Sequence, residues 1–402
     1  MVNKMMIHQD HFIDSGLLTR ILDLIISEGG DYEIDRFDIG KLSDQKSMLR
    51  LLLKADNEER LDDVATKLHA LGMRGEEGNE AQWETVSVDK AAPENFYSTT
   101  NHRSEVFFGG KWRQVRNQRM DASIVWREDG PECVKLRDLV VGDSVLTGTA
   151  SVRVYPPEVH GDDDVFAFMS NNVSSERNAT KAAEKVARMM KDIRDTQGRI
   201  IAVAGPVVVH TGGADALASL VRDGWVDGFL GGNAIAVHDL EFQLYGTSLG
   251  VDTVSGLPAQ GGHKNHMEAI NTVYTHGSIQ GMMREGKLAS GIMYEIITSR
   301  IPYCLAGSIR DDGPLPETEM DMIKAQGKYA EIIAGADMII MLSSMLHSIG
   351  TGNMTPSWVK TVCVDINPAV VTKLSDRGSS QAIGIVSDVG FFLRSLEQAL
   401  MP

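Results

Sequence analysis

The chain lacks most features that mark secreted, membrane-bound or disulfide-rich proteins. Its 402 residues include only three cysteines, Cys133, Cys304 and Cys363, which lie far apart and form no C-x-x-C pair. Such sparse cysteine usage argues against a disulfide framework or a thiolate zinc site, and it favours a reducing compartment. No apolar run reaches the ~18 residues of a spanning helix, and the start MVNKMMIHQDHF contains no signal-peptide core. We therefore expect a cytoplasmic protein that does not bind membranes.

Positive charge is also scarce. The chain has 39 Lys and Arg against 55 Asp and Glu, which gives a formal net charge of −16. Binding to phosphate backbones needs clustered basic side chains, so nucleic acids and anionic membranes are not expected partners. The chain is rich in apolar residues, at 43%, and its length suits two or three domains with sizeable cores.

Residues 1–92 follow the order of an α+β module. Apolar residues at helical spacing predict helices over 15–30 and between Asn57 and Gly72. Alternating patterns predict strands at MMIHQ, DYEIDRFDIG, SMLRLLLKA and QWETVSV. This order is typical of ACT-like and ferredoxin-like modules, which dimerise or bind a small effector. A packing domain without a ligand is the alternative that the sequence leaves open.

Residues 93–172 carry no long helical pattern and predict a small β-rich domain on the substrate side. The stretches STTNHRSEVFF and RNQRMDASIV each place hydrogen-bonding side chains at the mouth of a strand. Arg103, Arg116 and Arg119 can hold a carboxylate through paired hydrogen bonds, and Asp121 can receive an amine. A solvated strand edge with ordinary charges explains the same residues equally well.

Residues 173–402 predict a Rossmann-like domain. After a long helical stretch, near-continuous apolar strands alternate with helices, which indicates a parallel sheet covered on both faces. The first strand is expected at IIAVAGPVVV, and the second is expected to end in the turn 231–234. Ligands bind such sheets at the carboxyl ends of the strands. The polar turns expected at that edge are HTGG, GGNA, GSIRDDG, SSMLHS, DINP and SDVG.

A dinucleotide is expected at this edge although no G-x-G-x-x-G motif is present. Asp365 ends the apolar strand of TVCVDINP, where a carboxylate commonly accepts hydrogen bonds from the adenosine ribose of NAD. No Lys or Arg follows within the turn, which also favours NAD over its 2′-phosphorylated relative. An Asp that caps a helix beginning near Pro368 is nearly as good a reading of this residue alone.

The turn AGSIRDDGPLPET suits a hydroxyl or an ammonium group better than a phosphate. The negative charges of Asp311 and Asp312 would repel a phosphate, but they can accept hydrogen bonds from a ribose or from a substrate amine. Gly307 and Ser308 can offer a close backbone approach.

The histidines do not predict a metal centre. His263 and His266 lie three residues apart at the start of an expected helix, but no carboxylate stands at a matching spacing. We therefore expect no metal and assign His263 to a polar loop that positions substrate. His347 follows a strand and can contact a cofactor or exchange protons, with a satisfied core histidine as the alternative.

Long blocks of the sequence resemble a known family. GPVVVHTGG, GFLGGNAIAVHDLE, GGHKNHMEAIN, AGSIRDDGPLPET, MLHSIGTGNM and TVCVDINPAVVTKLSDRGS are similar to the archaeal-type NAD-dependent ornithine cyclodeaminases. The same module forms the C-terminal part of cyanobacterial bifunctional arginine dihydrolases, and its N-terminal region resembles the lysine-ketoglutarate reductase/saccharopine dehydrogenase conserved region. The likeness covers almost the whole chain and implies a deoxyhypusine-synthase-like NAD domain.

The resemblance implies a lyase of arginine and ornithine metabolism that converts L-ornithine to L-proline and ammonia, and we expect a homo-oligomer. NAD would be reduced and reoxidised within one turnover. The alternatives are an NAD-dependent dehydrogenase or amine transferase acting on a related diamino acid, and a non-catalytic regulator that senses NAD and an amino acid. The catalytic candidates are Asp121, Asp312 and His347, and the substrate candidates are Asn101, Arg103, Arg116, Gln118 and His263. The cofactor candidates are Gly232, Asn233, Ala234, Gly307, Asp311, Asp312, Ser344, Met345, Leu346, His347, Asp365, Ile366, Asn367, Asp388 and Val389.

Overall fold

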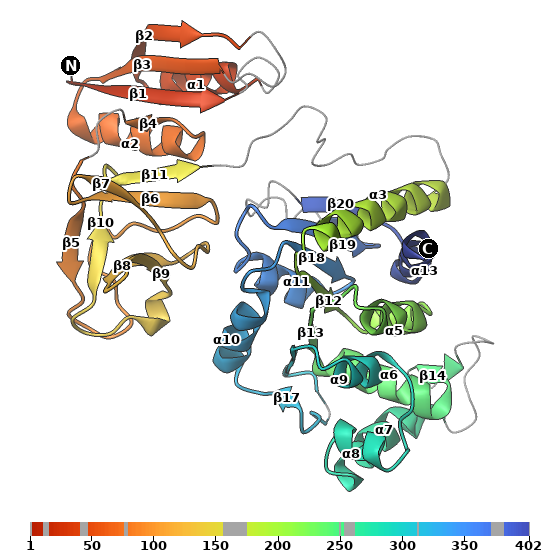
Figure 1. Ribbon diagram of the computed structural model, residues 1–402. Coiled ribbons are helices and arrows are strands. Elements are labelled where there is room, and N and C mark those ends of the chain that lie inside the picture. Colours follow the sequence, from red (N-terminus) through yellow and green to blue (C-terminus); the bar gives the residue numbers. More distant parts are fainter. Residues whose placement is uncertain are drawn as a thin grey trace. The chain divides into compact units, whose positions relative to one another are not determined.

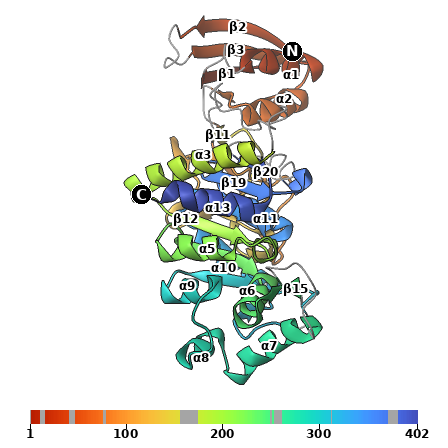
Figure 2. The same ribbon diagram turned by 90° about the vertical axis from the view of Figure 1, so that its right-hand side faces the viewer.

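The computed structural model divides into two compact units, which we describe separately. Unit one comprises Met1–Asp164 with Asn353–Trp358, and unit two comprises Val165–Gly352 with Val359–Pro402. Within them the structure describes residues 2–10, 16–40, 47–75, 79–155, 175–248, 251–252, 262–311, 313–370 and 382–401. Figures 1 and 2 show the elements of each unit from two directions. The expected domain boundaries at 92/93 and 172/173 stay a prediction.

Unit one begins with an antiparallel sheet in the order β2-β3-β1-β4, the arrangement of ferredoxin-like modules. Leu49, Leu51 and Leu53 alternate along β3 and are fully buried, together with Ile21 and Ile25 of the first helix. The apolar residues that recur every second position in the strand and every fourth position in the helix therefore pack into one core. The elements are β1 (Val2–Asp10), α1 (Leu17–Ser27), β2 (Asp31–Asp38), β3 (Ser47–Ala55), α2 (Glu58–Ala70) and β4 (Arg74–Gly75).

One strand assignment in this module is wrong. The stretch QWETVSV was expected to close the first sheet, but the strand that does so is β4, which has two residues. The predicted strand is β5 (Gln82–Thr85), and it pairs with β10 (Ser144–Thr147) of the next sheet. Alternation along one strand says that it is a strand but not which partner it has, and a two-residue strand leaves no periodic signal.

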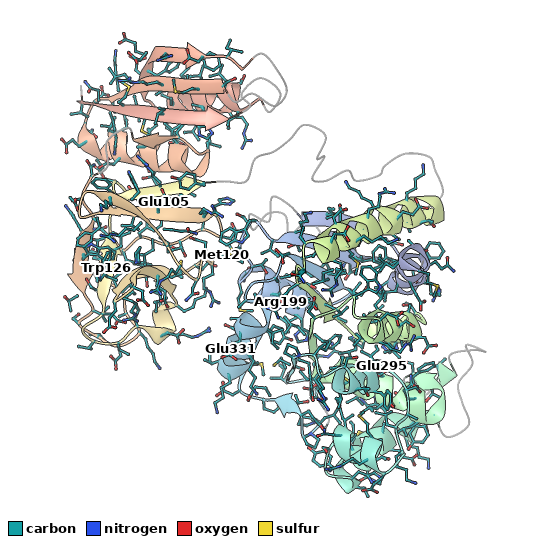
Figure 3. All side chains as sticks on the ribbon, viewed as in Figure 1. Glu105, Met120, Trp126, Arg199, Glu295 and Glu331 are labelled. Carbon is teal, nitrogen blue, oxygen red and sulfur yellow. The ribbon has the colours of Figure 1, made fainter. Side chains whose placement is uncertain are left out.

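The rest of unit one is β-rich, as predicted. It holds a sheet ordered β5-β10-β8-β9 and another ordered β11-β6-β7. Trp83, Phe108 and Trp126 pack edge to face at ring separations of 4.6–5.9 Å, and Figure 3 labels Trp126 within this part of the unit. The remaining elements are β6 (Arg103–Phe108), β7 (Lys111–Gln114), β8 (Ser123–Arg127), β9 (Gly130–Val134), η1 (Leu136–Asp138) and β11 (Val152–Tyr155).

Unit two is built on a seven-stranded parallel sheet ordered β17-β16-β13-β12-β18-β19-β20. This confirms the predicted Rossmann-like α/β domain. The chain runs outward from β12 in one direction and then returns to start again at β18, so the order reverses between these two strands. The strands are β12 (Ile200–Ala204), β13 (Gly228–Gly232), β16 (Tyr303–Ala306), β17 (Thr318–Glu319), β18 (Met338–Leu342), β19 (Lys360–Asp365) and β20 (Ala382–Val386).

Helices lie on both sides of this sheet, as Figure 1 shows with α3, α13 and α5 on one side and α10 on the other. Arg199, labelled in Figure 3, fastens the end of α10 to the start of β12 by donating to the carbonyls of Ala334 and Ile332. The helices are α3 (Ser175–Asp195), α4 (Val207–His210), α5 (Ala214–Arg222), α6 (Asn233–Tyr245), α7 (Asn265–Thr275), α8 (Ile279–Arg284), α9 (Ile292–Thr298), α10 (Met322–Ile333), α11 (Met345–Gly352) and α13 (Val389–Leu400). The short pieces are β14 (Thr247–Ser248), β15 (Val251–Asp252) and η2 (Gly262–Lys264).

Two local expectations in unit two need correction. The strand expected over IIAVAGPVVV stops at Ala204, and Val207–His210 forms α4 instead. Pro206 has no N–H for a sheet and its φ suits the start of a helix. Asn233 and Ala234 are not turn residues but the first turn of α6.

No described helix is both long enough and apolar enough to span a bilayer.

Candidate functional site

The turns after β12 and β18 touch at the point where the strand order reverses. The N–H of Gly205 donates to the carbonyl of Leu342 at 2.9 Å. A Cβ on Gly205 would lie 2.2 Å from the carbonyl oxygen of Ser343, so only glycine fits there. Ser343 itself has a left-handed φ of 47°. Because ligands of open α/β sheets bind at such reversal points, this edge is the candidate site.

His347, on α11, is held against the neighbouring strand by Tyr329 of α10. The Tyr329 hydroxyl lies 2.7 Å from the carbonyl oxygen of Gly231 and 3.0 Å from Nδ1 of His347. Burial raises the pKa of this phenol, so it keeps its single proton and donates it to the carbonyl. Nδ1 of His347 must then be the donor to the phenol oxygen. This assignment leaves Nε2 of a neutral ring as an acceptor.

Nε2 of His347 faces the backbone at the end of β13. A Cβ built on Gly232 would lie 2.6 Å from this nitrogen, so the imidazole occupies the space that a side chain would take. Burial lowers the pKa of His347, which keeps the ring neutral near pH 7. The fold therefore presents an uncharged proton acceptor at the carboxyl edge of the sheet.

Asn233 holds the loop that follows β16. Its Oδ1 accepts from the N–H of Leu315 and from the hydroxyl of Thr318, each at 2.9 Å, and its Nδ2 lies 3.4 Å from the carbonyl of Gly313. These three contacts use the carboxamide within the protein. The predicted contact of Asn233 with a cofactor stays a prediction. In the structure its carboxamide holds the loop after β16 in place.

The loop itself is tightened at its start by Asp311. One carboxylate oxygen of Asp311 accepts from the N–H of Ser308 at 2.7 Å. This turn places Gly307 beside Met320, since a Cβ on Gly307 would lie 2.3 Å from the Met320 sulfur. Asp312, expected both as a catalytic and as a cofactor residue, lies outside the described residues.

The ends of β19 and β20 carry two carboxylates with different local roles. Oδ1 of Asp365 accepts from the N–H of Asn367 at 2.8 Å, and Oδ1 of Asn367 in turn accepts from the N–H of Ala369 at 3.0 Å. Asn367, rather than Asp365, thus begins the turn at Pro368. Asp388 caps α13 through the N–H of Phe391 at 2.7 Å. Val389 is the buried first residue of that helix.

Large apolar side chains stand exposed along the same edge. Leu346 is 71% exposed and Ile366 is 69% exposed, and Ile309, Met345 and Val386 are exposed as well. They end or follow four of the strands at this edge. Ligand sites combine apolar side chains with a few polar groups, and the edge offers both.

The substrate-binding candidates of unit one differ in the contacts that their side chains already make. Arg116 reaches Asp129 at 3.3 Å and Glu132 at 3.1 Å, so its guanidinium is engaged by carboxylates of its own sheets. Arg103 is exposed and lies over the ring of Trp358, 5.5 Å from its centre. Gln118 is buried and donates to the carbonyl of Thr100 at 2.6 Å.

The other polar residues of this stretch include a half-buried arginine, Arg119. Burial lowers the pKa of Arg119, whose Nε has no hydrogen-bond partner among the described residues. Lys135 Nζ donates to the carbonyls of Met120, labelled in Figure 3, and of Asp121. Asp121 is exposed in a left-handed conformation with φ 55°. Asn101 is buried, and its carbonyl accepts from Ser357.

Sequence reasoning did not predict two side-chain arrangements of unit two. Tyr329 sits within KYAEII, where it looks like any core residue of a helix, so nothing in the pattern links it to His347. His266 does have acidic and imidazole neighbours, His238 and Glu241, but they lie on another helix. The side chain of His263 is outside the described part of the chain, so its expected role is untouched.

The reversed parallel sheet and its polar carboxyl edge define a Rossmann-type α/β protein with an additional α+β and β-rich unit. Family models match in three consecutive parts. They are the "LOR/SDH bifunctional enzyme conserved region" over 4–102, the "Arginine dihydrolase ArgZ-like, C-terminal, first region" over 103–183, and its "Rossmann fold" over 184–396. The chain belongs to this family of ArgZ-like C-terminal regions and archaeal ornithine cyclodeaminases.

Relatives from two kinds of organism support this assignment. The protein named ornithine cyclodeaminase of Methanocaldococcus jannaschii is 47% identical over 398 residues, covering 97% of this chain and 94% of the relative. The bifunctional arginine dihydrolase/ornithine cyclodeaminase ArgZ of Synechocystis sp. is 48% identical over 98% of this chain, which spans only 58% of that protein. The apo crystal structure of ArgZ matches 99% of this chain and 58% of its own, with 44% identity and a TM-score of 0.85.

A third relative has been crystallised with ligands. AgrE, known from Nostoc sp., is 45% identical in its ternary complex with ornithine and NAD⁺. That structure covers 99% of this chain and 57% of its own, with a TM-score of 0.54. The chain thus spans little more than half of each of these two bifunctional proteins.

Proposed function

We propose that this chain is an NAD-dependent ornithine cyclodeaminase, which converts L-ornithine to L-proline and ammonia without net oxidation. The observation that carries the proposal is AgrE, whose ternary complex contains ornithine and NAD⁺ and which is 45% identical over 99% of this chain. The M. jannaschii relative, of nearly the same length, is named for the same activity.

The carboxyl edge of the parallel sheet fits a dinucleotide. Asp365 has an oxygen that no described donor reaches, as ribose recognition requires. The backbone at Ser344 and Met345 begins an α-helix, which suits a phosphate, and the exposed Ile366 and Leu346 suit flat rings. Gly205 leaves the turn after β12 without a side chain at the point of strand reversal, where a pyrophosphate would pass.

NAD bound there supplies a hydride acceptor for the amine-bearing carbon and a hydride donor for the cyclic product. The protein has to take a proton from the substrate ammonium, because only the neutral amine can be oxidised or can attack. His347 is neutral and its Nε2 carries no proton, so this nitrogen is suited to accept the proton of the ammonium. Asp121 and Asp312 remain proposed partners for the amines.

The half-buried Arg119 is the group of unit one best suited to a substrate carboxylate. No hydrogen bond or ion pair of its guanidinium is observed within the described residues, whereas Arg116, whose Nε also lacks a partner, already binds two carboxylates through its terminal nitrogens. We therefore move the proposed carboxylate anchor from Arg116 to Arg119, with Gln118, Asn101 and Arg103 as neighbours. A cytoplasmic location, which three unpaired buried cysteines favour, and a homo-oligomeric state are part of the proposal.

The test is an incubation of purified protein with NAD and L-ornithine deuterated at the α-carbon. Equal amounts of proline and ammonia, deuterium retained in proline and no accumulating NADH are the expected results. Accumulating NADH would point to a net dehydrogenase, and lysine and other diamino acids would then be tried. Folded, NAD-saturated protein that makes no proline would overturn ornithine as the substrate. Arg119→Lys is expected to raise KM for ornithine, with Arg113→Lys on an exposed hairpin as the matched control.

A further inference from the structure

Two imidazoles converge on one carboxylate where α6 packs against α7. His238 and Glu241 lie on the same face of α6, three residues apart, and His266 lies in the first turn of α7. Nδ1 of His266 is 3.3 Å from Oε2 of Glu241, and Nδ1 of His238 is 3.6 Å from the same oxygen. All three ligand atoms lie within 4.8 Å of one another.

These separations are those of atoms that share a small metal ion. Zinc binds imidazole nitrogen and carboxylate oxygen at about 2.0–2.1 Å in tetrahedral geometry, which puts neighbouring ligand atoms about 3.3 Å apart. The two contacts to Oε2 of Glu241, at 3.3 and 3.6 Å, match that spacing. Three such ligands leave a fourth corner of the tetrahedron open.

The carboxylate is oriented by a second layer of hydrogen bonds. The Thr247 hydroxyl donates to Oε1 of Glu241 at 2.9 Å, and Nδ2 of Asn265 donates to the Thr247 oxygen at 2.9 Å. Oε1 therefore accepts the hydrogen bond of Thr247, and Oε2 faces the two imidazoles. Metal sites commonly use such outer partners to fix their ligands.

Hydrogen bonding within the protein satisfies only part of this cluster. Nδ1 of His266 hydrogen-bonds Oε2 of the fully buried Glu241 at 3.3 Å, but Nδ1 of His238, which is 6% exposed, has no hydrogen-bond partner among the described residues. Buried polar atoms without partners are rare and call for a ligand or a water. A cation held by Nδ1 of His238, Nδ1 of His266 and Oε2 of Glu241 would give the unpartnered nitrogen a partner.

The donor set also selects the kind of ion. Magnesium and calcium prefer oxygen ligands, whereas two imidazoles with one carboxylate suit zinc and its neighbours in the first transition series. We propose that His238, Glu241 and His266 form a binding site for a zinc-class divalent cation, with the fourth position open to water. The site goes beyond the proposed ornithine chemistry, which requires no metal.

Metal binding tests the site without relying on turnover. Tag-free protein is treated with chelator, dialysed against Zn²⁺ and analysed for metal content, and a second sample is titrated with Co²⁺. One tightly held equivalent of zinc and the visible absorption of tetrahedral cobalt are expected. Protein that retains no stoichiometric zinc and gives no such cobalt spectrum overturns the proposal.

Variants separate this cluster from ordinary surface histidines. Glu241→Gln and His266→Gln are expected to weaken Zn²⁺ binding at least about 10-fold and to abolish the cobalt bands. The matched control is His276→Gln, since His276 pairs with the exposed Glu285 at 2.9 Å and belongs to no three-ligand cluster in the described part of the chain. Metal binding unchanged in Glu241→Gln contradicts the assignment.

A further variant covers the case in which a buried ligand cannot be replaced without unfolding. Thr247→Val keeps all three ligands and removes the hydroxyl that donates to Oε1 of Glu241 and accepts from Nδ2 of Asn265. Zinc affinity is expected to fall about 10–100-fold, with the circular dichroism of the native protein retained. A wild-type affinity in this folded variant counts against the proposed geometry.

Discussion

Replacing Tyr329 by phenylalanine tests whether this residue sets the protonation of His347. Among the described residues the hydroxyl is the only observed acceptor for Nδ1–H of the His347 imidazole, so its removal leaves that donor unsatisfied. An unsatisfied buried donor costs about 1–3 kcal/mol of folding free energy. The ring is then also free to carry its proton on Nε2, which removes the acceptor that faces Gly232.

The expected result is a joint loss of stability and turnover. Urea unfolding should show a decrease of about 1–3 kcal/mol. The kcat for proline formation should fall about 10–100-fold, as when a partner that orients a histidine is removed, while KM for ornithine changes little. The acid limb of the pH profile of kcat should shift, because the proton on the imidazole is no longer assigned by the phenol.

Tyr294→Phe is the matched control, because Tyr294 is a partly buried tyrosine that packs against the hydrophobic core of the same unit, and its hydroxyl has no observed partner among the described residues. If Tyr329→Phe and Tyr294→Phe have equal stability and equal kcat, the phenol does not position the imidazole and the tautomer assignment is wrong. A loss of stability with unchanged kcat and pH profile would reduce Tyr329 to a packing residue and remove His347 from the proposed proton transfer.

Three further changes probe the scaffold of the two units. Asp239→Ala should lower stability by about 1–3 kcal/mol in thermal unfolding, since the buried carboxylate accepts the N–H groups of Ile292 and Met293 at the start of α9, and Asp239→Asn should lose less. Gly205→Ala should cost about 1–3 kcal/mol through overpacking against Ser343 and weaken NAD binding, whereas Gly327→Ala, with open space at its Cβ, should not reduce stability. Burial lowers the pKa of His102, so the folded state disfavours its protonation, and the wild type should lose stability relative to His102→Asn as pH falls below 6.5. Parallel urea midpoints between pH 7.5 and 5 for the two proteins would contradict this.

Local patterns in the sequence predicted most of the elements of both units. The alternation of Leu49, Leu51 and Leu53 predicted a half-buried strand, and continuous apolar runs such as the one over β18 predicted parallel strands buried on both faces. Both signals are local, since period and length depend only on neighbouring residues. The carboxyl edge could be named for the same reason, because polar residues after such strands must lie together once the sheet is parallel.

Partnerships between distant residues could not be read in this way. The strand at Gln82 was assigned to the wrong sheet, since any antiparallel partner satisfies its alternation. The ion pairs of Arg116 with Asp129 and Glu132 were not visible in the sequence, and its proposed contact with substrate stays a prediction. The hydrogen bonds that Asn233 makes to the loop after β16 were equally invisible, and its proposed cofactor contact also stays a prediction.

The sequence by itself determined the α/β class, the edge of the sheet where a ligand belongs, and the family. Those conclusions follow from local periodicity and from long blocks of similar residues. Only the tertiary structure joined Tyr329 to His347 and His266 to Glu241 and His238, across pairs of helices whose packing no local pattern reveals. Hydrogen bonds and metal ligation depend on distances of a few ångströms between side chains, and packing sets those distances.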